Sequence, residues 1–512
     1  MNGAESLVRT LLEAGIETCF ANPGTSEMHF VAALDRIPGM RCILGLTESV
    51  VTGAADGFGR MAGDPAVTLL HCGPGLANGL SNLHNARRVG TPIVNVVGDQ
   101  ASYHRALDPP LTADTEGWAR GVSAWTRTAA SAATLGQDAA VAIQAARSAP
   151  KRIATLIAPA DTCWDEGGVV GKPLAPTGPT PVAPHRVREV AQILRGTEPA
   201  FILLGGAFLD ARMLATAQAI GRATGAKVMA QAFNGRVERG RGRAPIERLP
   251  YGVDQAIAVL AGTKHLILIG AAPPAAPFAY PGKPGSLQPA DATIHVLARL
   301  ENDIPGAVAA LADELSVSVG AVEETGRPQP VPSGTLSSDA VTRALAALLP
   351  DNAIVVDESV SFGRPFFNGL AGAAPHDWLQ IGGGAIGNGF PMAAGAAVAA
   401  PGRRVVSLQA DGAGMFTMQA LWTQARENLD ITTVVLSNRK YQILLGELAN
   451  VGATAGRTAL DMLDIGRPDI DWVGLARSLG VDGGRAATME EFVPLFTGAN
   501  QRRGPFLIEL MI

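Results

Sequence analysis

The chain is poor in charge and in cysteine, and each shortage excludes a class of protein. Charged residues make up 17% of the 512 residues and the formal net charge is −5, so no basic surface for nucleic acid is expected. Four cysteines (Cys19, Cys42, Cys72 and Cys163) show no paired spacing, which fits a reducing cytoplasm. The sequence has no run of about 18 apolar residues that would predict a membrane span, and no basic region followed by an apolar core that would predict a signal peptide. We therefore expect a cytoplasmic protein without nucleic-acid or membrane partners.

What is present is a hydrophobic fraction of 47%, which is typical of large, well-buried domains. The length predicts two to four domains. Glycine and proline gather at 165–185 and again at roughly 322–334, and both stretches are interpreted as linkers. They divide the chain into 1–165, 186–325 and 335–512. Apolar strands alternate with helices in each part, so we expect an α/β fold of three doubly wound parallel sheets.

Two polar residues follow neighbouring strand-like runs in the third domain. Asp411-Gly412 comes after the run that begins at Val405, and Asn438 comes after the run that begins at Ile431. The carboxyl ends of parallel strands bind ligands, and oxygen donors of this kind suit Mg²⁺. Glycines 412 and 414 would let backbone N–H groups approach a diphosphate. The alternative is an ordinary turn at Asp411 and a helix cap at Asn438.

The spacing of these residues resembles the signature of thiamine-diphosphate enzymes, G-D-G followed after about two dozen residues by N-N. Ala410 and Ser437 depart from it, replacing the first glycine and the first asparagine. By this resemblance Asp411, Asn438 and the carbonyl of Lys440 are the metal ligands. Gly412, Ala413, Asn438 and Tyr441 join Asp411 as residues that bind thiamine diphosphate with Mg²⁺.

Glu48 begins a helix of small residues, E-S-V-V-T-G-A-A-D-G-F-G-R, directly after a strand-like run. Compensation of the helix dipole is the alternative reading of this carboxyl. The stretch resembles the pyrimidine-binding domain of the same family, with P-G-T-S upstream and H-C-G-P-G-L downstream. The resemblance implies that Glu48 binds the pyrimidine ring and promotes deprotonation of the thiazolium carbon. A carboxyl in an apolar site has a raised pKa and can share a proton in this way.

Two further stretches carry cofactor contacts by the same resemblance. In I-G-G-G-A-I-G-N-G-F-P, Ile386 would lie beneath the bent cofactor and the carbonyl of Gly384 would receive the aminopyrimidine. Core packing is the alternative for Ile386. In D-E-S-V-S-F-G, Ser359 or Ser361 would contact the diphosphate. Because the two halves of the site lie in different domains, the family pairs them between subunits, and we expect a homodimer or homotetramer.

Within the family, the chain resembles benzoylformate decarboxylase and acetolactate-synthase-like proteins. The first resemblance is carried by A-L-W-T-Q-A-R-E-N, F-A-N-P-G-T-S-E and L-L-H-C-G-P-G. Thr25 stands where a substrate-binding serine would be, and His71 where a proton-relay histidine would be. The second histidine of benzoylformate decarboxylase is missing, because Pro277 occupies about that place. His104, in the loop 98–114, is a substitute candidate, and a solvated surface loop is the alternative.

The resemblance implies decarboxylation of a 2-oxo acid, and three alternatives stay open. An acetolactate-synthase-like carboligase would join the product to a second carbonyl and suggests FAD in the middle domain, for which no decisive fingerprint is present. A 2-hydroxyacyl-CoA lyase would need a nucleotide site in that domain. A catalytically silent thiamine-diphosphate binder would fit the altered positions Ala410 and Ser437, but it has no use for Glu48.

Overall fold

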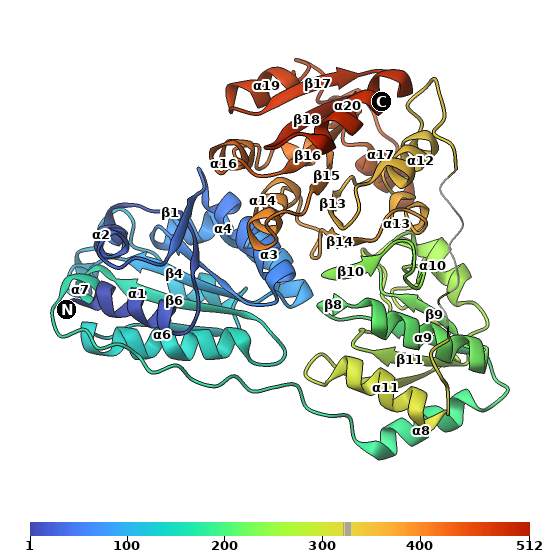
Figure 1. Cartoon of the computed structure of the whole chain (residues 1–512), viewed down its shortest axis with the longest axis horizontal. Coiled ribbons are helices and arrows are strands. Elements are labelled where there is room, and N and C mark those ends of the chain that lie inside the picture. The colour runs from blue at the N-terminus through green and yellow to red at the C-terminus, as the bar shows by residue number, and fades with distance from the viewer. Residues whose placement is uncertain (321, 323–328) are drawn as a thin grey trace.

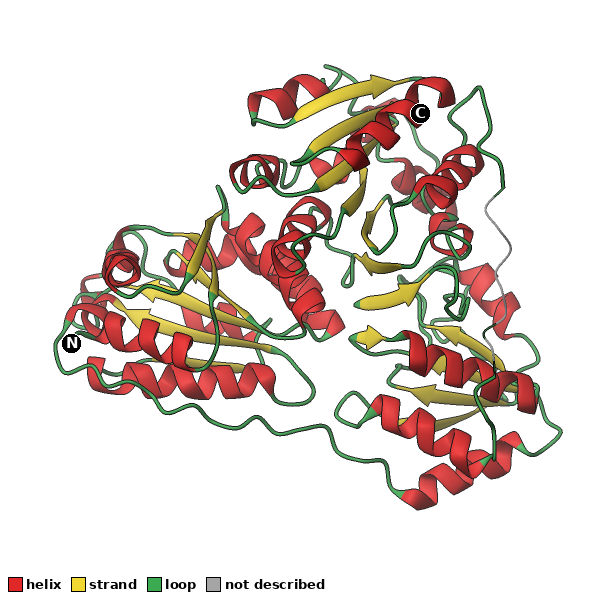
Figure 2. Ribbon diagram, viewed as in Figure 1, coloured by secondary structure: helices red, strands yellow, loops and turns green. Residues whose placement is uncertain are grey.

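The computed structural model describes residues 1–320, 322 and 329–512. These residues contain three β-sheets, each packed against helices (Figures 1 and 2). The predicted domain boundaries stay predictions. Residues 321 and 323–325 of the predicted middle domain, and 323–328 of the predicted second linker, lie outside the described residues. In Figure 1 the segment between α7 and α8 runs as an extended chain beneath the first domain toward the middle domain. None of the described helices is long and apolar enough to cross a membrane.

The first domain, all of whose residues are described, is built on a parallel sheet of order β2-β1-β3-β4-β6-β5. Every residue of β3 and β4 is buried, which agrees with the apolar runs that predict strands covered on both faces. The elements are α1 (Gly3–Glu13), β1 (Thr18–Asn22), η1 (Thr25–Glu27), α2 (Met28–Arg36), β2 (Arg41–Leu44), α3 (Glu48–Ala62), β3 (Ala66–Leu70), α4 (Cys72–Val89), β4 (Ile93–Asp99), η2 (Arg105–Leu107), α5 (Thr115–Arg120), β5 (Trp125–Thr128), α6 (Ala132–Arg147), β6 (Ile153–Pro159) and α7 (Ala160–Trp164).

The middle domain contains a parallel sheet of order β12-β11-β7-β9 among the described residues. The strands coincide with short apolar runs such as A-F-I-L-L, whose last four residues are buried. The elements are α8 (Pro184–Leu194), β7 (Ala200–Leu204), β8 (Phe208–Leu209), α9 (Ala211–Thr224), β9 (Lys227–Ala230), β10 (Arg236–Arg239), α10 (Val253–Leu260), β11 (His265–Ile269), β12 (Thr293–Ala298) and α11 (Ile304–Glu314).

The third sheet has the order β17-β18-β16-β15-β13-β14-β10-β8, so two strands of the middle region extend it. Sequence analysis missed β8 and β10 because one has two residues and the other reads R-V-E-R, without an apolar run. The elements are α12 (Ser338–Leu348), β13 (Ala353–Glu358), α13 (Phe366–Gly369), β14 (His376–Gln380), α14 (Gly389–Ala399), β15 (Val405–Ala410), α15 (Asp411–Gly414), α16 (Ala420–Arg426), β16 (Ile431–Ser437), α17 (Gln442–Asn450), α18 (Arg457–Leu463), α19 (Trp472–Ser478), β17 (Asp482–Ala486), α20 (Met489–Gln501) and β18 (Phe506–Met511).

The first and third domains meet where α3 packs along α14, near the centre of the molecule in Figure 1. Glycines allow this close approach. A Cβ on Gly57 would lie 2.0 Å from the carbonyl oxygen of Met392, and a Cβ on Gly395 would lie 1.8 Å from that of Ala54. One hydrophobic cluster runs through both domains as a result. The small-residue helix that begins at Glu48 is therefore an interdomain helix.

Candidate active site

Two oxygen-bearing side chains lie at the ends of the adjacent parallel strands β15 and β16. The Asp411 carboxylate is buried and accepts hydrogen bonds from the backbone N–H of Gly412, at 2.8 Å, and of Arg439, at 2.6 Å. Burial raises the pKa of the Asp411 carboxyl. The Asn438 amide oxygen accepts from the backbone N–H of Lys440 at 3.1 Å. Both side chains are held by the chain around them.

A pocket opens at this edge of the sheet, and all of the residues that line it belong to the third domain. A Cβ on Gly412 would lie 2.6 Å from the ring of Tyr441, so only glycine lets that ring form the wall. A buried carboxylate and a half-buried amide oxygen beside small residues fit a hard divalent cation and a diphosphate. The predicted cofactor and metal residues that line the pocket are Ser361, Ile386, Asp411, Gly412, Ala413, Asn438, Lys440 and Tyr441.

The loop that carries Ile386 is held by a buried carboxylate that sequence analysis missed. Glu358, the last residue of β13, accepts hydrogen bonds from the backbone N–H of Gly387, Asn388 and Gly389 at 2.8, 3.1 and 2.8 Å. A fourth bond, of 2.8 Å, comes from Gln409. Burial raises the pKa of Glu358. The sequence signal that could have indicated Glu358 is an acidic residue at the end of an apolar strand. The groups that it binds are distant in sequence and could not be predicted from it.

Asn85 holds the same loop from the first domain. Its amide oxygen accepts from the backbone N–H of Gly383 at 3.0 Å and of Ala385 at 3.2 Å, and its nitrogen donates to the carbonyl of Ala385 at 2.7 Å. Gly384 lies between these two residues with a φ of +81°, a conformation suited to glycine. The predicted Gly384 therefore belongs to a loop that α4 orients. Nothing in the local sequence indicated Asn85.

Glu48 begins α3, as the pattern predicts, and its side chain is buried. Its Oε2 accepts a hydrogen bond from the Asn78 side-chain nitrogen at 3.1 Å. A Cβ on Gly75 would lie 2.7 Å from its Oε1, so glycine at that position leaves room for the carboxyl. Glu48 thus lies against α4 of its own domain, and it is absent from the pocket around Asp411.

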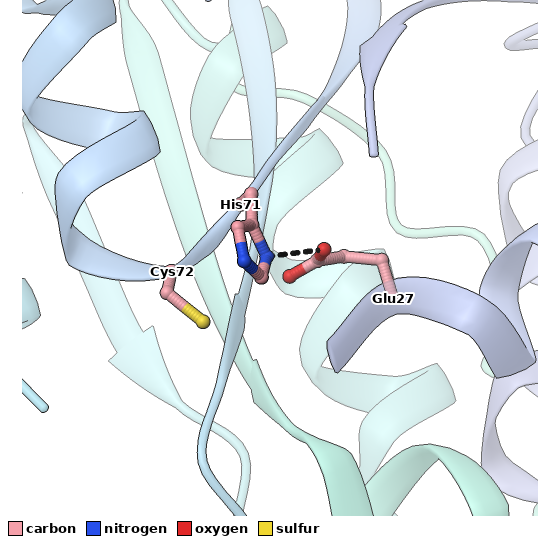
Figure 3. A group of neighbouring side chains, drawn as sticks. All are labelled: Glu27, His71 and Cys72. Carbon is pink, nitrogen blue, oxygen red and sulfur yellow. Dashed lines mark hydrogen bonds and ion pairs between the residues drawn. The ribbon is translucent and has the colours of Figure 1, made fainter. Parts of the chain in front are cut away.

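A pair of side chains joins the partly exposed His71 to the buried Glu27, as Figure 3 shows. The Nδ1 of His71 and the Oε2 of Glu27 are 2.8 Å apart. Glu27 is 2% exposed, and burial raises the pKa of its carboxyl. The same Oε2 accepts the backbone N–H of Gly24 at 2.8 Å. Sequence analysis missed Glu27, although the T-S-E after P-G is a local turn pattern that places a carboxylate near its own loop.

Cys72, the first residue of α4, lies on the other side of His71 (Figure 3). Its sulfur is 3.2 Å from the Ser26 hydroxyl, and burial raises the pKa of the thiol to about 11. Thr25 begins η1 in the same loop as Glu27 and is exposed. His104 is also exposed, before η2, and no hydrogen bond links its side chain to His71 or Glu27 in the described part of the chain. The roles of Thr25 and His104 stay predictions.

Comparisons with known proteins agree with this geometry. Residues 1–119 match the model of the N-terminal TPP binding domain of thiamine pyrophosphate enzymes, and residues 368–510 match that of the C-terminal TPP binding domain. Thiamine pyrophosphate is another name for thiamine diphosphate. A solved 4-hydroxybenzoylformate decarboxylase from Rhodococcus jostii superposes with a TM-score of 0.84 at 24% identity, covering 99% of this chain and 98% of that one, which shows the fold.

Two curated relatives extend over nearly the whole chain. IlvX of Mycobacterium tuberculosis, provisionally named an acetolactate synthase large subunit, is 50% identical over 517 aligned residues, covering 100% of this chain and 99% of IlvX. Benzoylformate decarboxylase of Pseudomonas aeruginosa is 28% identical, covering 97% of this chain and 96% of that protein. The matched ranges include Glu48 at one end and Asp411 and Asn438 at the other. The chain belongs to the thiamine pyrophosphate enzyme family.

Proposed function

We propose that this enzyme decarboxylates a 2-oxo acid and releases the corresponding aldehyde, with thiamine diphosphate and Mg²⁺ as cofactors. The observation that carries the proposal is the contact of the partly exposed His71 with the buried carboxyl of Glu27, beside the Thr25 loop. When bound, thiamine diphosphate supplies the nucleophilic carbon and the electron sink that loss of CO₂ requires. The protein's own side chains must then hold the cofactor and deliver a proton.

The third-domain pocket would hold the charged end of the cofactor. Asp411, Asn438 and the carbonyl of Lys440 would bind Mg²⁺, and Ser361 would contact the diphosphate. Ile386 would support the bend between the two rings. These residues fit because the buried Asp411 carboxylate and the half-buried Asn438 amide oxygen lie at adjacent strand ends, where open α/β sheets bind ligands.

Glu48 would bind the pyrimidine ring and share a proton with one of its nitrogens. Its neighbours Asn78 and Gly75 belong to the first domain, whereas the residues lining the pocket around Asp411 all come from the third. This separation supports completion of each site by two chains. We therefore propose a homodimer, or a tetramer built from such dimers, as the active form.

His71 would deliver the proton that completes aldehyde release. The Nδ1 of His71 would donate its proton in a hydrogen bond to Glu27, which would leave Nε2 to hold or transfer a proton at the substrate. Such an orienting carboxylate fixes the tautomer and the ring plane. A residue placed to protonate the product carbon favours release as aldehyde over capture by a second carbonyl.

The second candidate is carboligation without a flavin, favoured by the 50% identity to IlvX. At the carboxyl edge of the middle sheet, carboxylates already occupy two helix N-termini. Asp210 and Glu238 accept backbone N–H groups of α9, and Asp303 accepts one of α11. A Cβ on Gly270 would lie 2.5 Å from the Ile304 side chain, which fills the space between strands. This arrangement disfavours the diphosphate of FAD or coenzyme A.

The test is a product assay on 2-oxo acids that carry aliphatic or aromatic side chains, with and without an acceptor aldehyde. We expect CO₂ and aldehyde from the wild type, and His71→Ala should divert product from aldehyde to hydroxyketone. His185→Ala, an exposed histidine of α8, is the matched control. Hydroxyketone as the main wild-type product would favour the carboligase, and absence of CO₂ release from every acid would contradict both candidates.

A further inference from the structure

The fold brings together two cysteines that are 23 positions apart in sequence. Cys19 of β1 and Cys42 of β2 are register partners in adjacent parallel strands. Neighbouring strands lie roughly 4.8 Å apart, and disulfides bridge Cα atoms separated by roughly 4.4 to 6.8 Å. The backbone spacing therefore suits a disulfide without movement of either strand.

The two side chains also lie on the same face of the sheet. Phe20 and Ile43, their neighbours along each strand, belong to the hydrophobic cluster on one face, whereas Cys19 belongs to the cluster on the other. Since side chains alternate along a strand, Cys42 shares the face of Cys19. The neighbouring Cys19 thiol lowers the pKa of the Cys42 thiol, which agrees with this placement.

The pair has one accessible member and one protected member. Cys42 is exposed on the edge strand, and Cys19 is fully buried. The neighbouring Cys42 thiol and burial raise the pKa of the Cys19 thiol, and burial raises the pKa of Cys72 to about 11 and that of Cys163 to about 12. None of these three thiols is therefore the one that reacts first at neutral pH. Cys42 is the cysteine that an oxidant in solution would meet first.

We propose that Cys19 and Cys42 are a redox-active dithiol that forms a reversible disulfide with a peroxide as oxidant. The Cys42 thiolate attacks the terminal peroxide oxygen, the O–O bond breaks, and Cys42 becomes a sulfenic acid while hydroxide or an alkoxide leaves and takes a proton from water. The Cys19 sulfur then attacks the Cys42 sulfur, the S–O bond breaks, and water leaves with the Cys19 proton. Two thiols are oxidised and one peroxide is reduced.

The strand that carries Cys42 is also connected to the active site and to the third domain. Arg41 pairs with Glu427 at 3.1 Å, and the carbonyl of Leu44 accepts the hydroxyl of Thr423 at 3.0 Å. The chain then passes directly from β2 into α3 at Glu48. A disulfide between Cys19 and Cys42 would link the edge strand β2, which leads to Glu48, covalently to the neighbouring strand β1. In a reducing compartment such bonds are typically transient and responsive to oxidants.

The experiment treats the purified full chain with hydrogen peroxide under native conditions, blocks the remaining thiols by alkylation, and maps the peptides by mass. We expect a peptide pair linked through Cys19 and Cys42, lighter by two hydrogens and released by dithiothreitol. Cys42→Ser, a change at an exposed position, should abolish the link, and Cys163→Ser should retain it.

Two results would overturn the proposal. One is oxidation of Cys42 to sulfinic acid while Cys19 stays alkylatable. The other is a reducible dimer joined through Cys42 of two chains, seen on a non-reducing gel. Neither readout depends on the enzyme's reaction, so the proposal stands or falls separately from the proposed function.

Discussion

At the residue scale, the site rests on two buried carboxyls with different surroundings. Glu48 contacts an asparagine side chain at one domain's helix start, and Asp411 is held by two backbone N–H groups at another domain's strand end. In the proposed function the first would exchange a proton, and the second would ligate a cation. Substitution should therefore separate turnover from cofactor retention.

We predict that Glu48→Gln keeps the thermal stabilisation produced by thiamine diphosphate with Mg²⁺ and loses turnover by about 10²-fold or more. Asp411→Ala should instead lose the stabilisation, which for a ligand at 100 times its Kd is about 2.7 kcal/mol. Melting curves with and without cofactor, and CO₂ release, check both. Unchanged turnover of Glu48→Gln would remove that residue from the mechanism. Normal cofactor response of Asp411→Ala would contradict the assigned cation site.

The buried Glu27 carboxyl links stability to pH. Burial raises its folded-state pKa above the unfolded value, so the protonated form is favoured by folding. Its contribution to stability is present below the unfolded pKa of about 4.3 and is lost as pH rises through the raised folded pKa. At neutral pH the charged, buried Glu27 carboxylate therefore lowers the free energy of unfolding.

We predict that Glu27→Gln melts at a higher temperature than the wild type at pH 7.5 and that this difference shrinks toward pH 4.5. Turnover should fall, since the amide no longer holds His71 as the carboxylate does. Melting temperatures across this pH range make the comparison, with the exposed Glu13→Gln as control. A variant that is less stable than the wild type at pH 7.5, or a difference that grows in acid, would contradict the assignment.

At the scale of elements, the N-terminus of α14 depends on Glu358. The carboxylate satisfies three consecutive backbone N–H groups that the helix itself leaves without partners. A negative charge at this end also interacts favourably with the helix dipole. The loop before the helix carries Ile386, so this carboxylate positions the predicted support beneath the cofactor.

We predict that Glu358→Gln lowers the free energy of unfolding by about 2–4 kcal/mol, because one amide N–H would face the N–H of Gly389. Urea unfolding measures the change. Glu490→Gln is the matched control, since Glu490 also accepts a backbone N–H, from Gly334, but is exposed. Equal effects of the two substitutions would mean that burial of Glu358 has no special role.

At the scale of the molecule, Arg60 joins all three domains. From α3 it donates to the Gln380 carbonyl at 2.6 Å and to the Gly235 carbonyl at 3.3 Å, and it forms a two-bond pair with Asp56. The Arg60 and Asp56 side chains are 1% and 0% exposed. Breaking one partner of such a pair leaves an uncompensated charge in the interior.

We predict that Arg60→Met destabilises the protein by about 3–5 kcal/mol and that adding Asp56→Asn recovers part of the loss. Urea unfolding and limited proteolysis of the domain junctions are the measurements. Arg120→Met, which removes an exposed pair with Glu116 on α5, should have little effect. A double variant as unstable as the single one would show that charge burial is not the cause.

The sequence by itself determined the strand runs, the start of α3 at Glu48 and the residues at the ends of β15 and β16. Burial periodicity and the convergence of parallel strand ends are local properties of a sequence. They placed Asp411 and Asn438 at one edge of the sheet, whereas Ser361 and Ile386 were predicted from the family resemblance; all four residues line one pocket.

Only the tertiary structure decided which distant groups meet. Three sets of contacts join segments that are separate in sequence. Glu27 contacts His71, Asn85 and Glu358 hydrogen-bond the loop that carries Ile386, and Cys19 lies opposite Cys42 in the sheet. Such contacts depend on strand register and interdomain packing, which no local periodicity encodes. The positions of the candidate site residues could thus be predicted from the sequence. The residues that contact them could be identified only from the tertiary structure.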